Sequence, residues 1–501
     1  MASQFFTRKP YELLLEEMKD ENRLRRVLGP VTLTSLGVGA IIGTGIFVLT
    51  GIAAHDKSGP AIIISFLAAG IACVFAALCY AEFASMVPVA GSAYTYAYAT
   101  MGELFAWIIG WDLVLEYAVG SATVAHGWSH YFQDFIGIFG LSIPKIFMKA
   151  PIDFDPAVGH FVATGSILDL PAVIIAGIVT LILIKGIRES ATFNATMVGI
   201  KLAIVLLVIG VGVFFIDTNN WSNFAPFGYG GLTFFGNTVW GMEAVDGAPL
   251  GMLAGAAMIF FAYIGFDSVS THAEEAKNPR KDVPIGIIAS LLICTVLYIL
   301  VAGVLTGMVP YNQINIDAPV SDAFNKVGLT WAQFIISLGA LAGITSVLLV
   351  MMLSQPRVFL AMARDGLVPP SIFGAIHEKF RTPWKSTIIT GIFVAILAGF
   401  LPLRVLAELV NIGTLFAFVV VCTAVLIMRR KHPEAERPFK APLYPLVPIL
   451  GIITCSILMF SLPLENWYRL FGWLAVGIVI YLFYGRKHSV MHKMIQSGEV
   501  K

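Results

Sequence analysis

The chain has 501 residues, of which 57% are hydrophobic and only 13% are charged, and its mean hydropathy is +0.83. Soluble globular proteins carry about 25% charged residues, so this composition excludes a water-soluble globular protein and indicates an integral membrane protein. The net charge of +1 gives no indication of a nucleic-acid partner. The five cysteines lie in apolar stretches without metal-ligand spacing, which indicates neither disulfides nor a metal centre.

The first 29 residues show no apolar core of the signal-peptide type. Residues 10–27 alternate apolar and charged residues at helical spacing, which predicts an amphipathic helix on the cytoplasmic membrane surface. Gly29 and Pro30 end this helix, so the first membrane span is expected to begin there.

A helix needs about 20 apolar residues to cross a bilayer, and the hydropathy pattern predicts twelve such spans. They cover 31–54, 60–88, 98–130, 168–187, 192–216, 250–271, 284–308, 330–355, 384–401, 404–428, 445–462 and 466–484. If the N-terminus is cytoplasmic, the inner segments hold 25 of the 32 Lys and Arg residues and the outer segments hold 6. This asymmetry predicts that both termini are cytoplasmic.

Glycines interrupt the first and the sixth span. The stretch "GVGAIIGTGIF", residues 37–47, contains four of them, and Gly265 and Asp267 begin a polar run in the sixth. A helix breaks inside a membrane only where its freed backbone groups face a cavity or a ligand. Close helix packing through Gly39 and Gly43 is the alternative for the first stretch.

Interrupted helices at corresponding positions of two halves are typical of transporters with inverted repeats. The N-terminus of a half-helix offers N–H groups suited to a carboxylate, and a C-terminus offers carbonyls suited to an ammonium group. The two interruptions together therefore predict a site for an α-amino acid.

Ionisable residues also lie within the predicted spans. Lys201 is about 13 Å of helix rise from the inner end of its span, and because burial disfavours a charged amine, it can bind and release a proton. Asp112 and Glu116 are four residues apart, so they share a helix face, where they either line an aqueous cavity or bond to neighbouring helices. His126 and His130 have the same spacing but no third ligand, so we interpret them as interfacial polar residues.

Several motifs resemble the amino acid–polyamine–organocation (APC) superfamily. They include "GVGAIIGTGIFVLTG" and the text of spans two and three, and "EEAKNPRKDVPIGI" at 274–287 is most similar to bacterial homologues of the cationic amino acid transporter (CAT) family. "LSQPRVFLAMARDGLVP" at 353–369 and "LVNIGTLFAF" at 409–418 also match, and the likeness covers about residues 25–486.

The resemblance implies an all-α integral membrane protein with the LeuT-type fold. This fold has ten helices in a 5+5 inverted repeat, with helices one and six broken mid-membrane, plus two extra helices. The expected parts are the N-terminal helix 1–29, the first repeat 30–217, an extracellular loop 218–249, the second repeat 250–430, helices eleven and twelve at 431–485, and a cytoplasmic tail 486–501. The segment 217–249 is longer than the family needs and contains no Lys or Arg.

The resemblance further implies a secondary active transporter of the plasma membrane and not an enzyme. It is expected to import small or medium neutral, or else cationic, L-amino acids by proton-coupled symport, with no cofactor besides the proton. Exchange of one amino acid for another is the alternative. In the family, a lysine at the place of Lys201 stands where sodium binds in sodium-coupled relatives, so Lys201 is the expected proton-coupling group, near the carbonyls of residues 40–43. A permanently charged lysine that only holds the bundle together is the other interpretation.

The resemblance also implies which residues bind the substrate. They are Ile41, Gly43, Thr44, Gly45, Glu116, Phe261, Ala262, Ile264, Asp267 and Met351. Among them, Phe261 is a candidate gate, Asp267 is expected to cap a half-helix, and Met351 is expected to limit the length of the substrate side chain. Spans eleven and twelve are candidates for contact with a small membrane protein or a second copy. A membrane channel and a membrane enzyme fit the sequence less well, because the chain carries its own pseudo-repeats and no catalytic motif.

Overall fold

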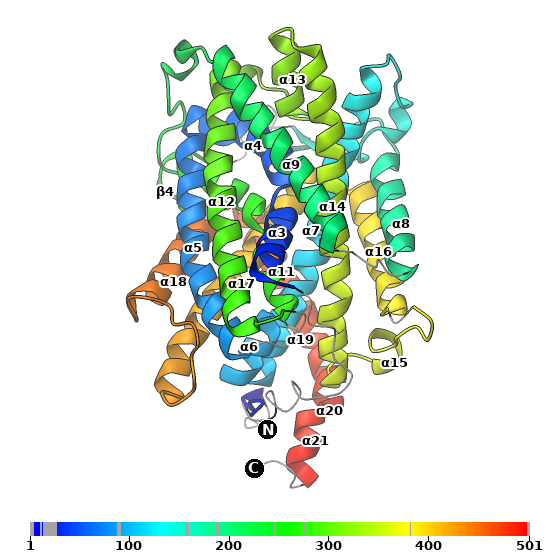
Figure 1. The fold of residues 1–501 in the computed structure, drawn as a ribbon, viewed down its shortest axis with the longest axis vertical. Helices are drawn as coiled ribbons and strands as arrows, with labels where there is room; N and C mark the ends of the chain where they lie inside the picture. Colours follow the sequence, from blue (N-terminus) through cyan, green and yellow to red (C-terminus); the bar gives the residue numbers. More distant parts are fainter. Residues whose placement is uncertain are drawn as a thin grey trace.

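The computed structural model describes residues 5–10, 13, 28–87, 92–155, 160–185, 191–235, 237–244, 247–273, 276–380 and 382–497. The expected amphipathic helix at 10–27 lies almost wholly outside these residues. Within them, eight helical runs are long and apolar enough to cross a membrane, and four shorter apolar helices accompany them. Figure 1 shows the long helices running along the bundle, with both chain ends at one end. We call this end the terminal end and the opposite end the far end.

The larger helices are α3 (Pro30–Ile41), α5 (Ile62–Met86), α6 (Ala93–Thr100), α7 (Glu103–Gly137), α8 (Leu170–Lys185), α9 (Ala191–Gly212), α10 (Met252–Ile259), α12 (Pro279–Met308), α13 (Pro319–Lys326), α14 (Thr330–Arg364), α16 (Trp384–Phe400), α17 (Leu403–Lys431), α18 (Leu446–Phe460), α19 (Leu464–Ile480) and α21 (Val490–Ser497). Short helical segments include η1 (Gly45–Leu49), α4 (Thr50–Ala53), η2 (Ala54–Ser58), η3 (Gly59–Ala61), η6 (Thr218–Trp221), η7 (Phe260–Tyr263), α11 (Ser268–Thr271) and α15 (Pro370–Phe373). Each predicted span overlaps helical segments within these bounds, and eight helical runs among the described residues are long and apolar enough to cross a membrane.

The third span begins later than predicted. The sequence pattern places its start at residue 98, whereas the structure separates α6 from α7 at Gly102, whose φ of +113° favours glycine. The backbone of Phe6 crosses at this place, and a Cβ on Gly102 would lie 2.7 Å from the Phe6 carbonyl carbon. The apolar pattern continues through the turn, which is why hydropathy alone does not mark it.

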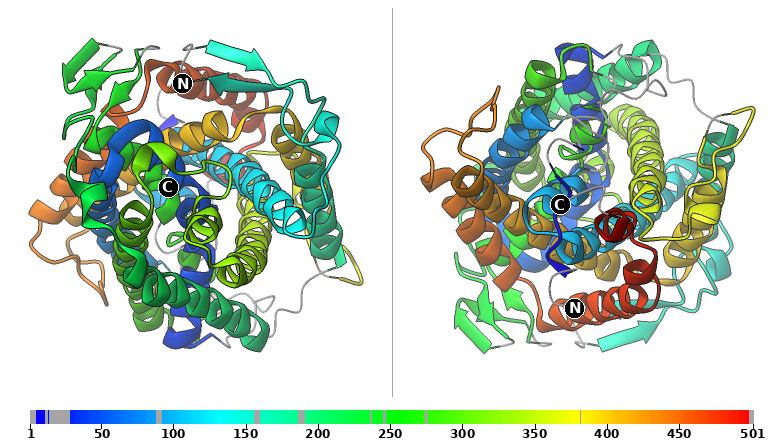
Figure 2. Two further views of the ribbon diagram at one scale, coloured as in Figure 1. Left: turned by 90° about the horizontal axis from the view of Figure 1, so that it is seen from above. Right: turned by 90° about the horizontal axis from the view of Figure 1, so that it is seen from below.

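The helix α7 runs through the interior of the bundle. It packs against α14, α17, α16, α8 and α6, and Figure 2 shows it surrounded by other helices when the bundle is seen end-on. Its buried residues include Trp107, Asp112, Glu116 and Tyr117. Helix α7 therefore places polar side chains from the middle of its length at the centre of the protein.

The last long helix, α19, is bonded to α7 through three tryptophans. The indole N–H of Trp111 donates to the Trp473 carbonyl at 2.9 Å, and that of Trp473 donates to the Trp111 carbonyl at 3.0 Å. Trp107 donates to the Gly477 carbonyl at 2.8 Å, and the rings of Trp111 and Trp473 stack at 4.6 Å. These bonds satisfy three buried or half-buried donors and fix the two helices in register.

Strands occur in the long loops at the far end, where the sequence predicted none. They form three antiparallel hairpins: β1 (Ile152–Asp155) with β2 (His160–Ala163), β3 (Leu232–Phe234) with β4 (Asn237–Trp240), and β5 (Met242–Glu243) with β6 (Pro249–Leu250). Glycines with positive φ, among them Gly231 and Gly241, lie next to these strands and allow the sharp turns between them. The expected extracellular loop at 218–249 is thus partly ordered as a sheet.

Candidate functional site

The first interruption lies between α3 and η1, within the stretch where glycines predicted it. Helix α3 ends at Ile41, and Ile42 has an extended backbone with φ −73° and ψ 104°. The last helical bond runs from the Ile42 N–H to the Val38 carbonyl at 3.0 Å, so the Gly39 carbonyl is the first that the helix leaves without an amide partner. Beyond the break, the first N–H groups of η1 have no partner inside their own helix.

The second interruption follows α10 and also matches the prediction. The chain tightens into the 3-10 helix η7, becomes extended at Ile264, and turns at Gly265 with φ +121° before α11 begins. Only glycine adopts this φ readily. A Cβ on Gly265 would lie 3.0 Å from the carbonyl group of Ala40, so the residue also permits close approach to the first interruption.

The two interruptions contact each other. The hydroxyl of Tyr298, from α12, lies 2.8 Å from the Ile41 carbonyl and 3.0 Å from the Ala262 carbonyl, so a single side chain joins them. Gly45 faces the backbone of Ala262 so closely that a Cβ there would meet the Ala262 Cα. Tyr298 was not among the predicted site residues. Its one signal was a tyrosine inside an apolar span, whose hydroxyl needs a hydrogen-bond partner when buried.

Lys201 reaches the first interruption from α9. Its side chain is buried, and its ammonium group donates to the Gly39 carbonyl at 2.5 Å. The expected carbonyls were those of residues 40–43, and this detail is wrong by one residue, because the helix ends early enough to free the Gly39 carbonyl. Among the described residues, no carboxylate lies within ion-pair distance of Lys201, whose stem packs on Gly343.

Three carboxylic acids gather beside the second interruption. Asp112 and Glu116 of α7 are fully buried, and all four of their side-chain oxygens have no hydrogen-bond partner. Asp267 lies within electrostatic reach of Glu116 and accepts a hydrogen bond from the Tyr117 hydroxyl at 2.7 Å. The Thr414 hydroxyl of α17 is buried beside the Glu116 carboxyl. Buried polar atoms are nearly always bonded, so these unpartnered atoms indicate a place for a ligand or for water.

Asp267 does not cap α11 as expected. It occupies the position before the helix, but its own backbone is helical, with φ −66° and ψ −29°, and its side chain makes no cap hydrogen bond. One carboxylate oxygen instead accepts from the Gly265 N–H at 3.3 Å, on the side of the interruption. The residue therefore stabilises the turn itself.

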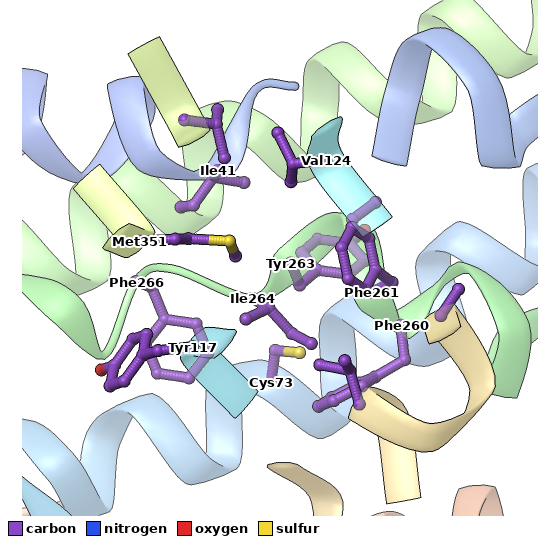
Figure 3. Close-up of a cluster of buried hydrophobic side chains, with 14 of the residues drawn as sticks. Ile41, Cys73, Tyr117, Val124, Phe260, Phe261, Tyr263, Ile264, Phe266 and Met351 are labelled. Atoms are coloured by element: carbon purple, nitrogen blue, oxygen red, sulfur yellow. The ribbon is translucent and has the colours of Figure 1, made fainter. Parts of the chain in front are cut away.

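The expected substrate-binding residues come together around the interruptions, and all of them are buried. Gly43 packs on Val347 of α14, and Thr44 packs on Gly127 of α7. In Figure 3 the Met351 side chain points toward Ile264, with Ile41 on one side and Tyr117 on the other. Phe261 lies next to Val124 in the same view. Apolar side chains from several helices thus gather around the two interruptions.

His126 is buried and His130 is partly buried, and both lie at the far end of α7 among loop residues. The His126 ring lies 3.2 Å from Asp169, and the His130 ring lies 3.5 Å from Asp317, a residue of the loop before α13. They line a separate far-end cavity of about 150 Å³ with residues of the loops. Burial acts to raise the pKa of Asp317, but His130 and Lys149 hold it below its ordinary value. The described residues contain no cluster of three metal-ligating side chains.

Two interrupted helices that meet inside an apolar bundle are typical of a membrane transporter. Comparison with known proteins agrees, because residues 28–484 match the amino acid permease family. The chain belongs to this family, a group of multi-pass membrane proteins within the APC superfamily, as the motifs predicted.

Three relatives illustrate the range of names in the family. The chain is 45% identical to a methylthioribose transporter of Bacillus subtilis (strain 168), over 98% of this chain and 100% of that protein. It is also 45% identical to the branched-chain amino acid permease BcaP of the same organism, with the same coverage. It is 40% identical to the vacuolar cationic amino acid transporter 4 of Arabidopsis thaliana, over 82% of this chain and 65% of that protein.

Proposed function

We propose that the chain is a secondary active transporter that carries a neutral amino acid together with a proton by alternating access. The observation that carries this proposal is the contact between the two interruptions. It brings the start of η1 and the end of α3 to one buried place, and the N–H and carbonyl groups that lack an amide partner within their own helix there are of the kinds that suit a carboxylate and an ammonium group. Ile41, Ile264 and Met351 offer an apolar surface to the substrate side chain.

We propose that the apolar segments take the LeuT-type arrangement, with the interruption after α3 and the one after α10 at equivalent places of two inverted repeats. The excess of Lys and Arg in the segments at the terminal end supports a cytoplasmic location for both chain ends. In the expected plasma membrane, the far end then faces outward. The substrate would reach the interruptions from one side at a time.

The substrate class rests on these apolar side chains and on the relatives. Ile41 and Met351 are apolar and suit contact with an aliphatic side chain, and one relative is named a branched-chain amino acid permease. Methylthioribose is the second candidate, because a relative of equal identity is named its transporter. This sugar carries neither a carboxylate nor an ammonium group, so it would leave the helix ends without charged partners.

Competition for uptake separates these candidates. Purified protein in liposomes is expected to take up labelled leucine, and unlabelled isoleucine and valine are expected to compete. Saturable uptake of methylthioribose without competition by any amino acid would overturn the amino acid assignment. Uptake that requires amino acid inside the vesicle would show exchange in place of symport.

Lys201 is the proposed proton-coupling group. Its ammonium bond to the Gly39 carbonyl ties protonation to the end of α3, because only the protonated form donates a full set of hydrogen bonds. Lys201→Met is expected to abolish accumulation driven by an inward proton gradient while leaving exchange of labelled for unlabelled substrate. Lys57→Met is the matched control, since Lys57 is also buried and also donates to a carbonyl, that of Pro249, but lies away from the interruption. Accumulation by Lys201→Met with the pH dependence of the wild type would contradict the assignment.

A further inference from the structure

The hairpin β3–β4 carries a group of exposed apolar side chains, which we call the hairpin face. It consists of Phe234, Phe235, Val239 and Trp240, whose exposed fractions lie between 47% and 64%. Exposed aromatic groups of this size mark contact surfaces. The proposed transport function makes no use of them, and the hairpin belongs to the segment that is longer than the family needs.

The hairpin face is continuous with two membrane helices. The Phe234 ring lies 5.5 Å from that of Phe460, the last residue of α18, and the Phe235 ring lies 5.6 Å from that of Trp467 in α19. The Thr233 hydroxyl donates to the Phe460 carbonyl at 3.0 Å, which ties the hairpin to the end of α18. Figure 1 shows the hairpin along the flank of the bundle beside α5, and Figure 2 shows it at the rim.

Helix α18 is short for a membrane span. Its 15 residues rise about 22 Å, whereas the hydrocarbon core of a bilayer is about 30 Å thick. A helix this short either leaves a gap beneath the lipid headgroups, for which its far end is one of two places, or forces the bilayer to thin. The hairpin face lies at this end and supplies apolar surface where the helix stops.

The chemistry of the hairpin matches the membrane interface more closely than water or the bilayer centre. The whole segment 217–249 lacks Lys and Arg, and tryptophan and other aromatic rings concentrate where headgroups meet acyl chains. The unpaired edges of a two-stranded hairpin would be too costly in pure hydrocarbon. An interfacial position allows headgroups and water to bond these edges while the rings contact acyl chains.

We propose that the hairpin face lies in the membrane interface at the far end, in contact with lipid, and extends the apolar surface of α18. With the proposed orientation this is the outer leaflet. The proposal does not depend on which substrate the protein carries.

Nitroxide labels in liposomes of phosphatidylcholine and phosphatidylglycerol test the placement. Val239→Cys and Trp240→Cys provide two label positions on the hairpin face, and Asn219→Cys in η6 provides an exposed far-end control. The unsubstituted protein gives the background, since its five cysteines are buried. Variants are compared only if they keep the thermal midpoint of the wild type.

The expected result is that both hairpin labels collide with dissolved oxygen several-fold more often than with a water-soluble nickel chelate, and that the Asn219 label does the reverse. Hairpin labels with the aqueous behaviour of the control would overturn the proposal. Labels shielded from both reagents would also overturn it. Dipolar broadening would then identify a second copy as the occupant, and its absence would show that the labelled positions pack within the protein itself.

Discussion

Tyr298 is the residue whose removal tests most directly whether contact between the interruptions matters. Tyr298→Phe keeps the ring and its packing but deletes the hydroxyl that lies between the Ile41 and Ala262 carbonyls. The hydroxyl has a single proton, so the substitution removes the one side-chain donor that these two buried carbonyls share. The ring has tilted contacts with the rings of Tyr263 and Phe66, which the substitution preserves.

The free-energy cost of Tyr298→Phe follows from the hydrogen bonding that these two carbonyls lose. A buried acceptor left without a partner costs about 1–3 kcal/mol, and each 1.4 kcal/mol is a tenfold change in an equilibrium constant. If the joined arrangement is the one that binds substrate, the KM for leucine uptake should rise by roughly an order of magnitude. The thermal midpoint in detergent should fall as well.

Tyr263→Phe is the matched control for this measurement. Tyr263 is equally buried and donates to a single carbonyl, that of Phe66, at 2.7 Å, outside the contact between the interruptions. It should lower the thermal midpoint by a similar or smaller amount and leave the KM near that of the wild type. If both variants show the same KM, the link between the interruptions has no role in binding and the reasoning fails.

Three further predictions address the site and the far end. Gly45→Ala places a methyl group against Ala262, an overpacking of about 1–3 kcal/mol, and should reduce leucine uptake about tenfold or more without preventing membrane insertion, measured by surface labelling. Met351→Ser should admit longer substrates, and an uptake screen that shows no gain for arginine would remove Met351 as the limit on side-chain length. Because the pKa of Asp317 is held below its ordinary value of about 3.9, its stabilising contribution is present at neutral pH and is lost as the pH falls through the lowered pKa. Asp317→Asn should therefore lower the thermal midpoint at pH 7, and the difference from the wild type should shrink as the pH falls through the lowered pKa of Asp317; a difference independent of pH would contradict this account.

The positions of the helices could largely be read from the sequence. The predicted span 384–401 corresponds to α16, and 250–271 contains α10, η7 and α11. Glycines located both interruptions, because a positive φ at Gly265 and the close contact at Gly45 are requirements of the backbone that a single residue type meets. A backbone requirement at a single position can be recognised from the residue type at that position in the sequence.

Contacts between distant residues were not accessible in the same way. Nothing near Tyr298 in the chain indicates that its hydroxyl lies between two carbonyls, since these come from segments 257 and 36 residues away. The Lys201 partner was missed by one residue because helix ends are the least determined feature of a sequence pattern. The hairpin β3–β4 was not predicted, because its exposed apolar residues match neither the pattern of a buried strand nor that of a solvated loop.

The exchange of indole bonds between Trp111 and Trp473 has a mechanical consequence. Sliding α19 along α7 by even one residue would break both hydrogen bonds and unstack the rings, so the two helices form a single rigid unit. Glu116 belongs to α7 and is therefore part of this rigid unit. During a transport cycle, Glu116 would keep its position while the interrupted helices move relative to it. A pair of fluorescent labels on α7 and α19 should therefore show no change in distance when substrate is added.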